Sequence, residues 1–217
     1  MKAKFLFLLM MFTLNGFTQN DTKTTFFSIT PRSSGNLKVN GLALGLGLNM
    51  SENNSIKSVN GMNIEVNPLS IFILMFDDPS RRGFQETPTL HVNGLNIGTG
   101  HSNMNEDIAY SGISISLFNA GYSCNGISIN GIYNYSTKLN GLHLSLLSND
   151  SKFANGMFLA FSNNSQQLNG IQIGVLNNSQ SFKGIQIGII NKCKTQKGLQ
   201  IGFWNSNNKR SMPFLNW

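Results

Sequence analysis

The sequence predicts an all-β repeat protein whose copies stack as the coils of a β-solenoid. Three observations lead to this prediction: a unit of about 14 residues recurs, its apolar residues alternate with polar ones, and turn-forming residues stand at fixed places in it. Glycine makes up 22 of 217 residues and only 12% of the residues are charged, which suits a β protein with many turns.

The N-terminus has the pattern of a secretory signal peptide. Lys2 and Lys4 flank the start of an apolar stretch at residues 5–14, which is too short for a membrane helix of about 20 residues. We therefore expect residues 1–18 to be a signal peptide. The chain is then exported, to the periplasm, the outer membrane or the cell surface.

The rest of the chain divides into a leader, a repeat domain and a tail. Residues 19–38 are polar and are expected to form a leader and N-terminal cap. The repeats occupy residues 39–205 and are interrupted by an irregular insertion at 68–90. Residues 206–217 are expected to cap the last coil, since they contain Lys209, Arg210 and Pro213, residue types that protect a sheet edge.

The repeat unit is Asn-Gly-aliphatic-x-aliphatic. With the glycine as position 0, ten copies begin at Gly41, Gly61, Gly94, Gly112, Gly126, Gly141, Gly156, Gly170, Gly184 and Gly198. From the fourth copy onward the spacings are 14, 15, 15, 14, 14 and 14 residues. Position +1 is Leu, Met or Ile and position +3 is Leu or Ile in every copy. This alternation predicts one strand with an apolar face in each copy.

Three further positions repeat. Asparagine precedes the glycine in seven copies, and position −2 is mostly apolar. A second asparagine stands at +7 in the later copies, but at +8 in the two copies of 15 residues, as Asn134 and Asn149. The extra residue of these two copies predicts a bulge inside the strand.

Two architectures fit this pattern. In a β-solenoid each copy is one coil, positions −2, +1, +3 and +5 point inward, and asparagines stack as amide ladders. Residues such as Ile173, Ile187 and Ile201 then form one buried row at +3. In the alternative, an up-and-down outer-membrane β-barrel, each copy is one strand whose aliphatic face meets lipid.

The constant polarity of the copies favours the solenoid, because successive strands of a meander run in opposite directions. An aromatic residue at the end, Trp217, is typical of outer-membrane barrels, but Pro213, four residues before it, disfavours a membrane strand. In a solenoid Cys124 and Cys193 lie five coils apart, about 24 Å along the axis. A disulfide needs Cα atoms within about 7 Å, so the two thiols are expected to be unbonded.

The final copies carry a family resemblance. Residues 169–205 read NGIQIGVLNNSQSFKGIQIGIINKCKTQKGLQIGFWN. This run resembles the bacterial surface-repeat proteins whose unit is Gly-Leu-Gln-Ile-Gly-x-x-Asn, and the resemblance extends more loosely over residues 39–217. The closing residues 210–217 resemble the ends of related exported proteins from Gram-negative bacteria. The resemblance implies an exported, envelope- or surface-associated protein and supplies no catalytic residues.

The acidic residues do not suggest catalysis. Residues 108–217 contain one acid, Asp150, whereas hydrolysis of glycosidic bonds takes a pair of carboxylates. The adjacent acids at 77–78 and 106–107 point in diverging directions along the chain. We expect no catalytic residue, no cofactor and no metal site, and therefore a non-enzymatic scaffold or binding surface.

Basic residues gather near the C-terminus. Residues 183–210 contain no acid. Their six basic side chains are Lys183, Lys192, Lys194, Lys197, Lys209 and Arg210. Stacked coils would concentrate this charge and indicate an anionic partner such as lipopolysaccharide or an acidic glycan, and association with the outer membrane. The alternative is that these lysines keep an open sheet edge soluble. We expect no nucleic-acid partner.

Overall fold

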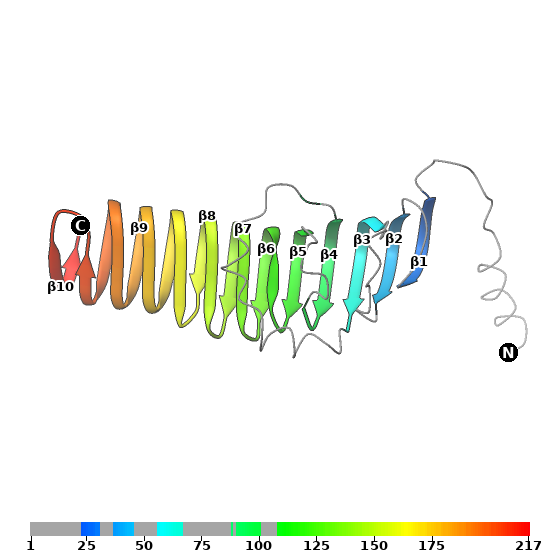
Figure 1. The fold of residues 1–217 in the computed structure, drawn as a ribbon, viewed down its shortest axis with the longest axis horizontal. Helices are drawn as coiled ribbons and strands as arrows, with labels where there is room; N and C mark the ends of the chain where they lie inside the picture. Colours follow the sequence, from blue (N-terminus) through cyan, green and yellow to red (C-terminus); the bar gives the residue numbers. More distant parts are fainter. Residues whose placement is uncertain (1–22, 31–36, 46–55, 67–87, 89, 101–107) are drawn as a thin grey trace, which may run out of the picture.

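The computed structural model describes residues 23–30, 37–45, 56–66, 88, 90–100 and 108–217. These residues form ten strands in one continuous sheet, ordered β1 to β10 along the chain. The strands are β1 (Lys23–Thr30), β2 (Leu37–Gly45), β3 (Ile56–Glu65), β4 (Leu90–Gly98), β5 (Ile108–Ser116), β6 (Asn119–Asn130), β7 (Tyr133–Ser145), β8 (Ser148–Leu159), β9 (Ser162–Ser206) and β10 (Ser211–Asn216). They coil one after another along a single axis (Figure 1), which confirms the predicted β-solenoid.

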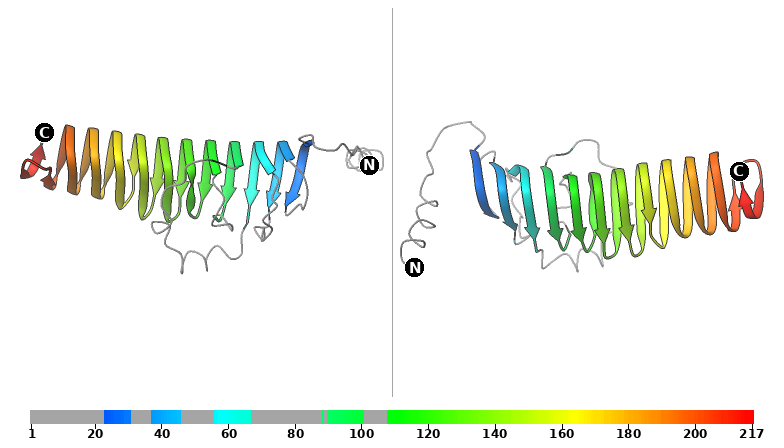
Figure 2. Two further views of the ribbon diagram at one scale, coloured as in Figure 1. Left: turned by 45° about the horizontal axis from the view of Figure 1, so that its top comes forward. Right: turned by 180° about the vertical axis from the view of Figure 1, so that it is seen from behind.

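Every neighbouring pair from β1 to β9 is parallel. The repeat positions stack on their own kind: Gly61 pairs with Gly94, and Ile64 pairs with Ile97. β9 alone runs for 45 residues and includes the starts of the last three copies, at Gly170, Gly184 and Gly198. Figure 2 shows the same succession of coils from two further sides. An up-and-down barrel would need antiparallel neighbours, so the structure excludes that alternative.

The solenoid ends in an antiparallel strand. β10 lies against the last coil of β9, with Leu215 beside Ile201 and Asn216 beside Gln200. Asn216 donates to the Oε1 atom of Gln200 at 2.8 Å. The last coil is thus covered by a strand of opposite direction, which does not offer the parallel edge that a further coil would need.

The repeated glycine is imposed by the backbone. Gly184 has φ +133°, and a Cβ atom there would lie 2.0 Å from the carbonyl oxygen of Gly170, one coil earlier. L-residues rarely adopt such a φ, and no side chain fits at that distance. Position 0 therefore accepts only glycine where the chain passes this point of each coil.

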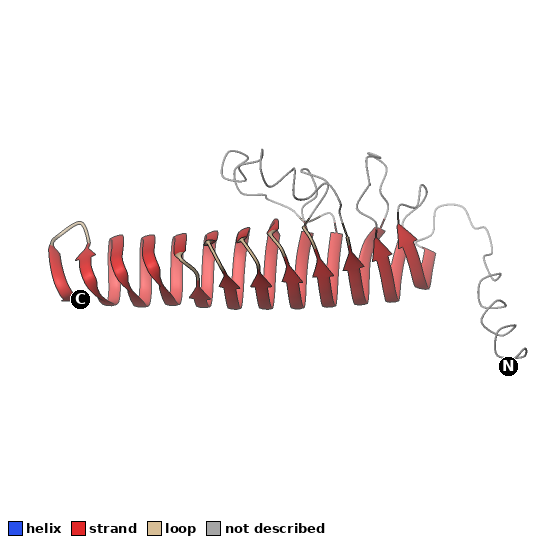
Figure 3. Cartoon of the chain, turned by 90° about the horizontal axis from the view of Figure 1, so that it is seen from below, coloured by secondary structure: helices blue, strands red, loops and turns tan. Residues whose placement is uncertain are grey.

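The extra residue of the longer copies lies between strands. β6 ends at Asn130 and β7 begins at Tyr133, and the next interruption falls at residues 146–147, between β7 and β8. Figure 3 shows these turns aligned along one edge of the solenoid. The predicted bulge inside the strand is therefore wrong. The turn absorbs the added residue because pairing is already interrupted there, so the ladder is left intact.

The predicted inward face is wrong except at −2, because the side chains at +1, +3 and +5 point outward, as the exposed Met62, Ile187 and Phe203 show. Position −2 points inward as expected, and Val39, Val59 and Val92 there are at most 2% exposed. The side chains at +3 point outward, however: Ile187 is 39% exposed and Ile201 is 37% exposed. The inward side chains are those at +2, which are polar in most copies.

The physical reason is the unbroken alternation of the strand. β6 runs through Gly126 without a break, so inward residues recur every second position from −2 through 0 to +2. Positions −1, +1 and +3 must then face outward. Placing both −2 and +3 inside would have required the strand to change phase at the glycine.

Amide ladders fill the interior. Asn163 donates to Asn177 at 3.0 Å, Asn177 to Asn191 at 2.8 Å, and Asn191 to Asn205 at 2.7 Å. The Nδ2 group of Asn177 also donates to the carbonyl oxygen of Ile187 at 2.8 Å, in the next coil. Each amide therefore bonds to the coils on both sides, so its burial leaves no polar atom unpaired.

A second ladder runs along +2. Gln186 donates to Gln172 and Gln200 donates to Gln186, each at 2.8 Å. Across the interior, the hydroxyl of Ser179 donates to the Oε1 atom of Gln172 at 3.2 Å. The two sides of a coil are thus joined by side-chain hydrogen bonds as well as by the packing of the apolar −2 row, which includes Leu168 and Phe182.

The two cysteines are free, as predicted. Both are buried. Burial raises the pKa of the Cys124 thiol to about 12, although a hydrogen bond with Ser128 opposes the shift, and burial raises that of Cys193 to about 11. Both thiols stay protonated near neutral pH and are poor nucleophiles.

Several predicted segments lie outside the described residues. They include the signal peptide at 1–18 and nearly all of the insertion at 68–90. Within the leader at 19–38, Lys23–Thr30 form β1, the first rung of the sheet.

His143 occupies the +2 row and is fully buried. Its Nδ1 atom lies 2.7 Å from the hydroxyl of Ser128, and its ring stacks on Phe158 with centroids 5.3 Å apart. The Nε2 atom is buried and has no hydrogen-bond partner among the described residues. Burial lowers the pKa of His143 to about 4, while a backbone hydrogen bond with Asn140 opposes the shift.

This histidine predicts a pH-dependent stability. Because the unfolded chain binds the proton more readily, stability is full above pH about 6.5 and falls as the pH drops toward 4. The lowered pKa of His143 contributes about 3 kcal/mol to the free energy of unfolding at neutral pH. We expect His143→Gln, which places the residue of later copies at +2, to reduce the difference in unfolding free energy between pH about 7.5 and 4.5 by about 2 kcal/mol.

Urea denaturation at both pH values measures this change. Asn178→Gln changes an exposed side chain that does not titrate. It provides the control and should leave the pH dependence as in the wild type. If His143→Gln leaves the difference in unfolding free energy between the two pH values unchanged, the buried imidazole is not the source of the pH dependence.

The asparagine ladder predicts a sharp contrast between neighbours. Asn177→Ala removes the partner of both Asn163 and Asn191 and the side-chain donor to the Ile187 carbonyl, at a cost of about 2–4 kcal/mol. Asn178→Ala alters an exposed side chain and should change stability by less than about 0.5 kcal/mol. Thermal unfolding of both variants gives the comparison, and equal losses would contradict the ladder as a source of stability.

Candidate functional site

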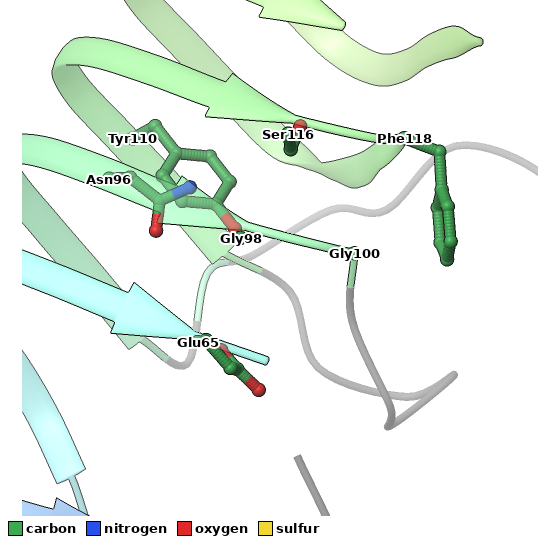
Figure 4. A pocket seen from close by; sticks show the side chains of 7 residues that line it. All are labelled: Glu65, Asn96, Gly98, Gly100, Tyr110, Ser116 and Phe118. Carbon is green, nitrogen blue, oxygen red and sulfur yellow. The ribbon is translucent and has the colours of Figure 1, made fainter. Parts of the chain in front are cut away.

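A small recess lies at the ends of β3 to β5. Figure 4 shows it with Glu65, Asn96, Tyr110, Ser116 and Phe118 around it. Its volume is about 10 Å³, which holds at most a single water molecule. This recess is therefore too small to hold a larger ligand.

Among the described residues, no group of three or more His, Cys, Asp or Glu side chains could hold a metal ion. The acidic pairs at 77–78 and 106–107 lie outside the described residues. In the described part of the chain, no helix has the length and apolarity to cross a membrane.

The outside of the described coils has an apolar face, which we define as the outward side chains at +1 and +3. Its +1 residues are Leu42, Met62, Leu95, Ile113, Ile127, Leu142, Met157, Ile171, Ile185 and Leu199. Its +3 residues are Leu44, Ile64, Ile97, Ile115, Ile129, Leu144, Leu159, Ile173, Ile187 and Ile201. β10 extends the +3 row, since Leu215 pairs with Ile201.

These side chains are accessible although they stack closely. Ile113 is 45% exposed, Ile115 41% and Ile129 46%. Each is covered on two sides by the same position of the neighbouring coils and is open outward. The ten copies place no charged residue at +1 or +3, so the face is uniformly apolar.

The turn beside the +3 row is also apolar. We call this the apolar edge; it comprises Leu146, Leu147, Phe161, Leu176, Ile189, Phe203 and Trp204, all exposed. Phe203 is the most open of them, at 70%. The apolar surface therefore continues from the flat face around one edge of the solenoid.

The opposite border of the apolar face is a neutral amide ladder at −1. Asn93 donates to Asn60 and Asn60 to Asn40, each at 2.8 Å. Further along, Asn155 donates to Asn140 at 2.9 Å and Asn140 to Asn125 at 2.6 Å. Along most of its length the apolar face is thus bordered by uncharged polar groups.

The predicted basic residues fall into three groups. Lys183 and Lys197 replace asparagine at −1 of two adjacent coils and are exposed, one rung apart. Lys192 and Lys194 are exposed on a single stretch of β9, at +8 and +10. The structure therefore brings the first pair together on one row, with the second pair on another outward surface of the same coils.

The remaining two basic residues lie in the turn before β10. Lys209 is exposed. Arg210 instead donates from Nε to the side chain of Asn216 at 2.8 Å and from Nη2 to the carbonyl oxygen of Trp217. Its guanidinium lies 4.4 Å from the centre of the Trp217 ring. Arg210 thus holds the end of the chain and is a weak candidate for binding an anion.

The apolar face was missed by sequence reasoning, which placed the +3 row inside. The apolar residues at −2 could have revealed this face. If −2 points inward, strict alternation along the strand places +2 inside and therefore +1 and +3 outside. Comparison with protein-family models, with curated proteins and with solved structures found no match to this chain.

The lysines predict salt-sensitive retention on an anionic resin. Lys183→Gln, Lys194→Gln and Lys197→Gln combined should elute from heparin or lipopolysaccharide resin at lower salt than the wild type, because exposed charges act additively within about 8–10 Å. The control combines Lys23→Gln, Lys38→Gln and Lys152→Gln, three exposed lysines elsewhere. Equal elution of the two triple variants would assign the C-terminal lysines to edge protection.

Proposed function

We propose that this chain is a non-enzymatic, exported protein of the cell envelope or cell surface that acts as a rigid scaffold and presents a binding surface. The observation that carries the proposal is the apolar face: every copy presents two aliphatic side chains outward, over the whole length of the solenoid.

Rigidity follows from the way the coils are joined. Neighbouring strands pair in parallel throughout the repeats, and buried amides connect each coil to the next. Each coil contacts only its neighbours, as in other repeat proteins, so length is added without changing local structure. Such a body suits a function in which fixed spacing along an axis matters.

A binding role follows from the cost of leaving the face open. Soluble monomers rarely expose continuous apolar areas larger than a few hundred Å². The apolar face is larger than such an area, since it includes two rows of Leu, Ile and Met across all ten copies. A surface of this kind is typical of a contact with a protein or a membrane.

Export is supported by the sequence of residues 1–18. The resemblance of the later copies to exported surface-repeat proteins supports the same compartment. Anion binding at Lys183 and Lys197 is a second candidate function, favoured by their position on neighbouring rungs of one row.

Fractionation of a Gram-negative host that expresses residues 1–217 tests the proposal. We expect the wild type to lose residues 1–18 and to enter the envelope or the medium. Ile115→Ser, Ile129→Ser and Ile187→Ser combined should weaken envelope retention, since they remove apolar area from the face. Gln167→Ser, Asn178→Ser and Gln180→Ser combined alter exposed polar side chains and provide the matched control.

Mass spectrometry of the purified chain reports cleavage, and antibody detection reports the fraction. A chain that keeps residues 1–18 and stays in the cytoplasm would contradict export. An apolar-face variant that fractionates like the wild type would contradict a role of the apolar face in envelope retention.

A further inference from the structure

We propose that the apolar face binds the same face of a second copy of this chain, so that two solenoids form a symmetric dimer. The proposal rests on the proposed function, in which the apolar face is the working surface, and it names the partner. Its basis is the size, neutrality and regularity of the face.

The size of the face matches one half of a standard interface. Ten copies and β10 at about 4.8 Å per rung give a length of about 50 Å. Its two outward rows, +1 and +3, each take up two residues of strand at about 3.3 Å per residue, which gives a width of about 13 Å. The product is on the order of 650 Å², close to the roughly 800 Å² per partner that specific complexes bury.

The charges of the chain allow two faces to meet. The chain has a formal net charge of +7, but no copy has a charged residue at +1 or +3, so like charges are not brought together in the centre of the contact. In an antiparallel arrangement, Lys183 and Lys197 at the C-terminal end of one copy lie over the Asn40 and Asn60 end of its partner. Lys183 and Lys197 of one copy are thereby kept away from the same lysines of the other copy.

The shape of the face also suits a second copy. Each row repeats at the strand spacing and is rich in β-branched Ile, so the side chains form regular ridges and grooves. Two such sheets pack about 10 Å apart with interleaved side chains. Identical chains have identical spacings, so a row that fits at one rung fits at all of them.

A lipid bilayer is the competing occupant, and the border of the face argues against it. Membrane-surface elements have lysine or arginine on the polar face beside the apolar one. Here the −1 border of the described copies is asparagine or serine from Asn40 to Asn169, and only the last two copies have lysine. Both tryptophans of the chain, Trp204 and Trp217, lie at its C-terminal end, so they do not border the face along its length.

The decisive variants introduce charge at the middle of the face. Ile129 lies in the fifth of the ten copies, where the two chains of a symmetric dimer place the same residue near the two-fold axis. Ile129→Lys then sets two like charges close together, as does Ile129→Glu. Gln167→Lys, at an exposed polar position, adds the same charge outside the face.

Sedimentation velocity of the purified chain measures the outcome. We expect a dimer for the wild type and for Gln167→Lys, and a dissociation constant raised by at least about 100-fold for Ile129→Lys and for Ile129→Glu alone. An equimolar mixture of the Lys and Glu variants should form the dimer again, because the opposite charges then meet. Recovery on mixing separates a lost contact from misfolding.

Three results would overturn the dimer: a monomeric wild type at high micromolar concentration, an Ile129→Lys variant that associates like the wild type, or no recovery on mixing. A monomeric wild type that cosediments with phosphatidylethanolamine–phosphatidylglycerol vesicles would assign the face to lipid instead. Loss of envelope retention in the apolar-face variant, together with a monomeric chain, would reject the dimer and keep the proposed function. A dimer that stays in the cytoplasm would reject the proposed function and keep the dimer.

Discussion

The in-register stacking of one coil on the next is the constraint from which the rest of the structure follows. Inside the repeats, each inward side chain lies against the same repeat position of the coils on either side, so a residue is tolerated there only if it packs or bonds with the residue at that position. A carboxamide meets this requirement because it holds a donor and an acceptor in one plane. The Asn163–Asn205 and Gln172–Gln200 rows show the result. The glycine of each copy obeys the same rule in the backbone, because a Cβ atom at that position would collide with a backbone carbonyl oxygen of the preceding coil.

The polar interior decides what the outside must be. The inward places of a narrow coil are taken by Asn, Gln, Ser and the −2 row, so the aliphatic residues of the repeat have only the outer surface left. There they stack as closely as the amides do inside, but one side of each remains open to solvent. A fold with a closed interior and an open apolar face has its capacity for recognition on that face, and the apolar edge widens it around the turns.

The two ends of the solenoid differ in how their rows finish. At the C-terminal end, Asn216 completes the glutamine row, and Arg210 ties the final turn through Asn216 and Trp217. At the other end of the described residues, Ser28 lies in the +2 row with a buried hydroxyl that has no partner among them. The C-terminal coil is thus a finished end, and this asymmetry gives the scaffold a direction.

The sequence by itself determined the repeat, its phase and its stacking. Period, glycine positions and constant polarity were enough to predict a solenoid, stacked asparagines and two cysteines too far apart to bond, because identical copies can be equivalent only when they stack. Which face of each strand turns inward was decided by the tertiary structure. Hydrophobicity indicated +1 and +3, and Ile187 would have been placed in the core on that criterion. The unbroken strand through the glycine places Gln186 there instead, and ladders between coils remove the cost of burying its amide. Hydropathy of single residues does not include hydrogen bonds between copies, so the interior and the exposed apolar face became visible only when the coils were assembled.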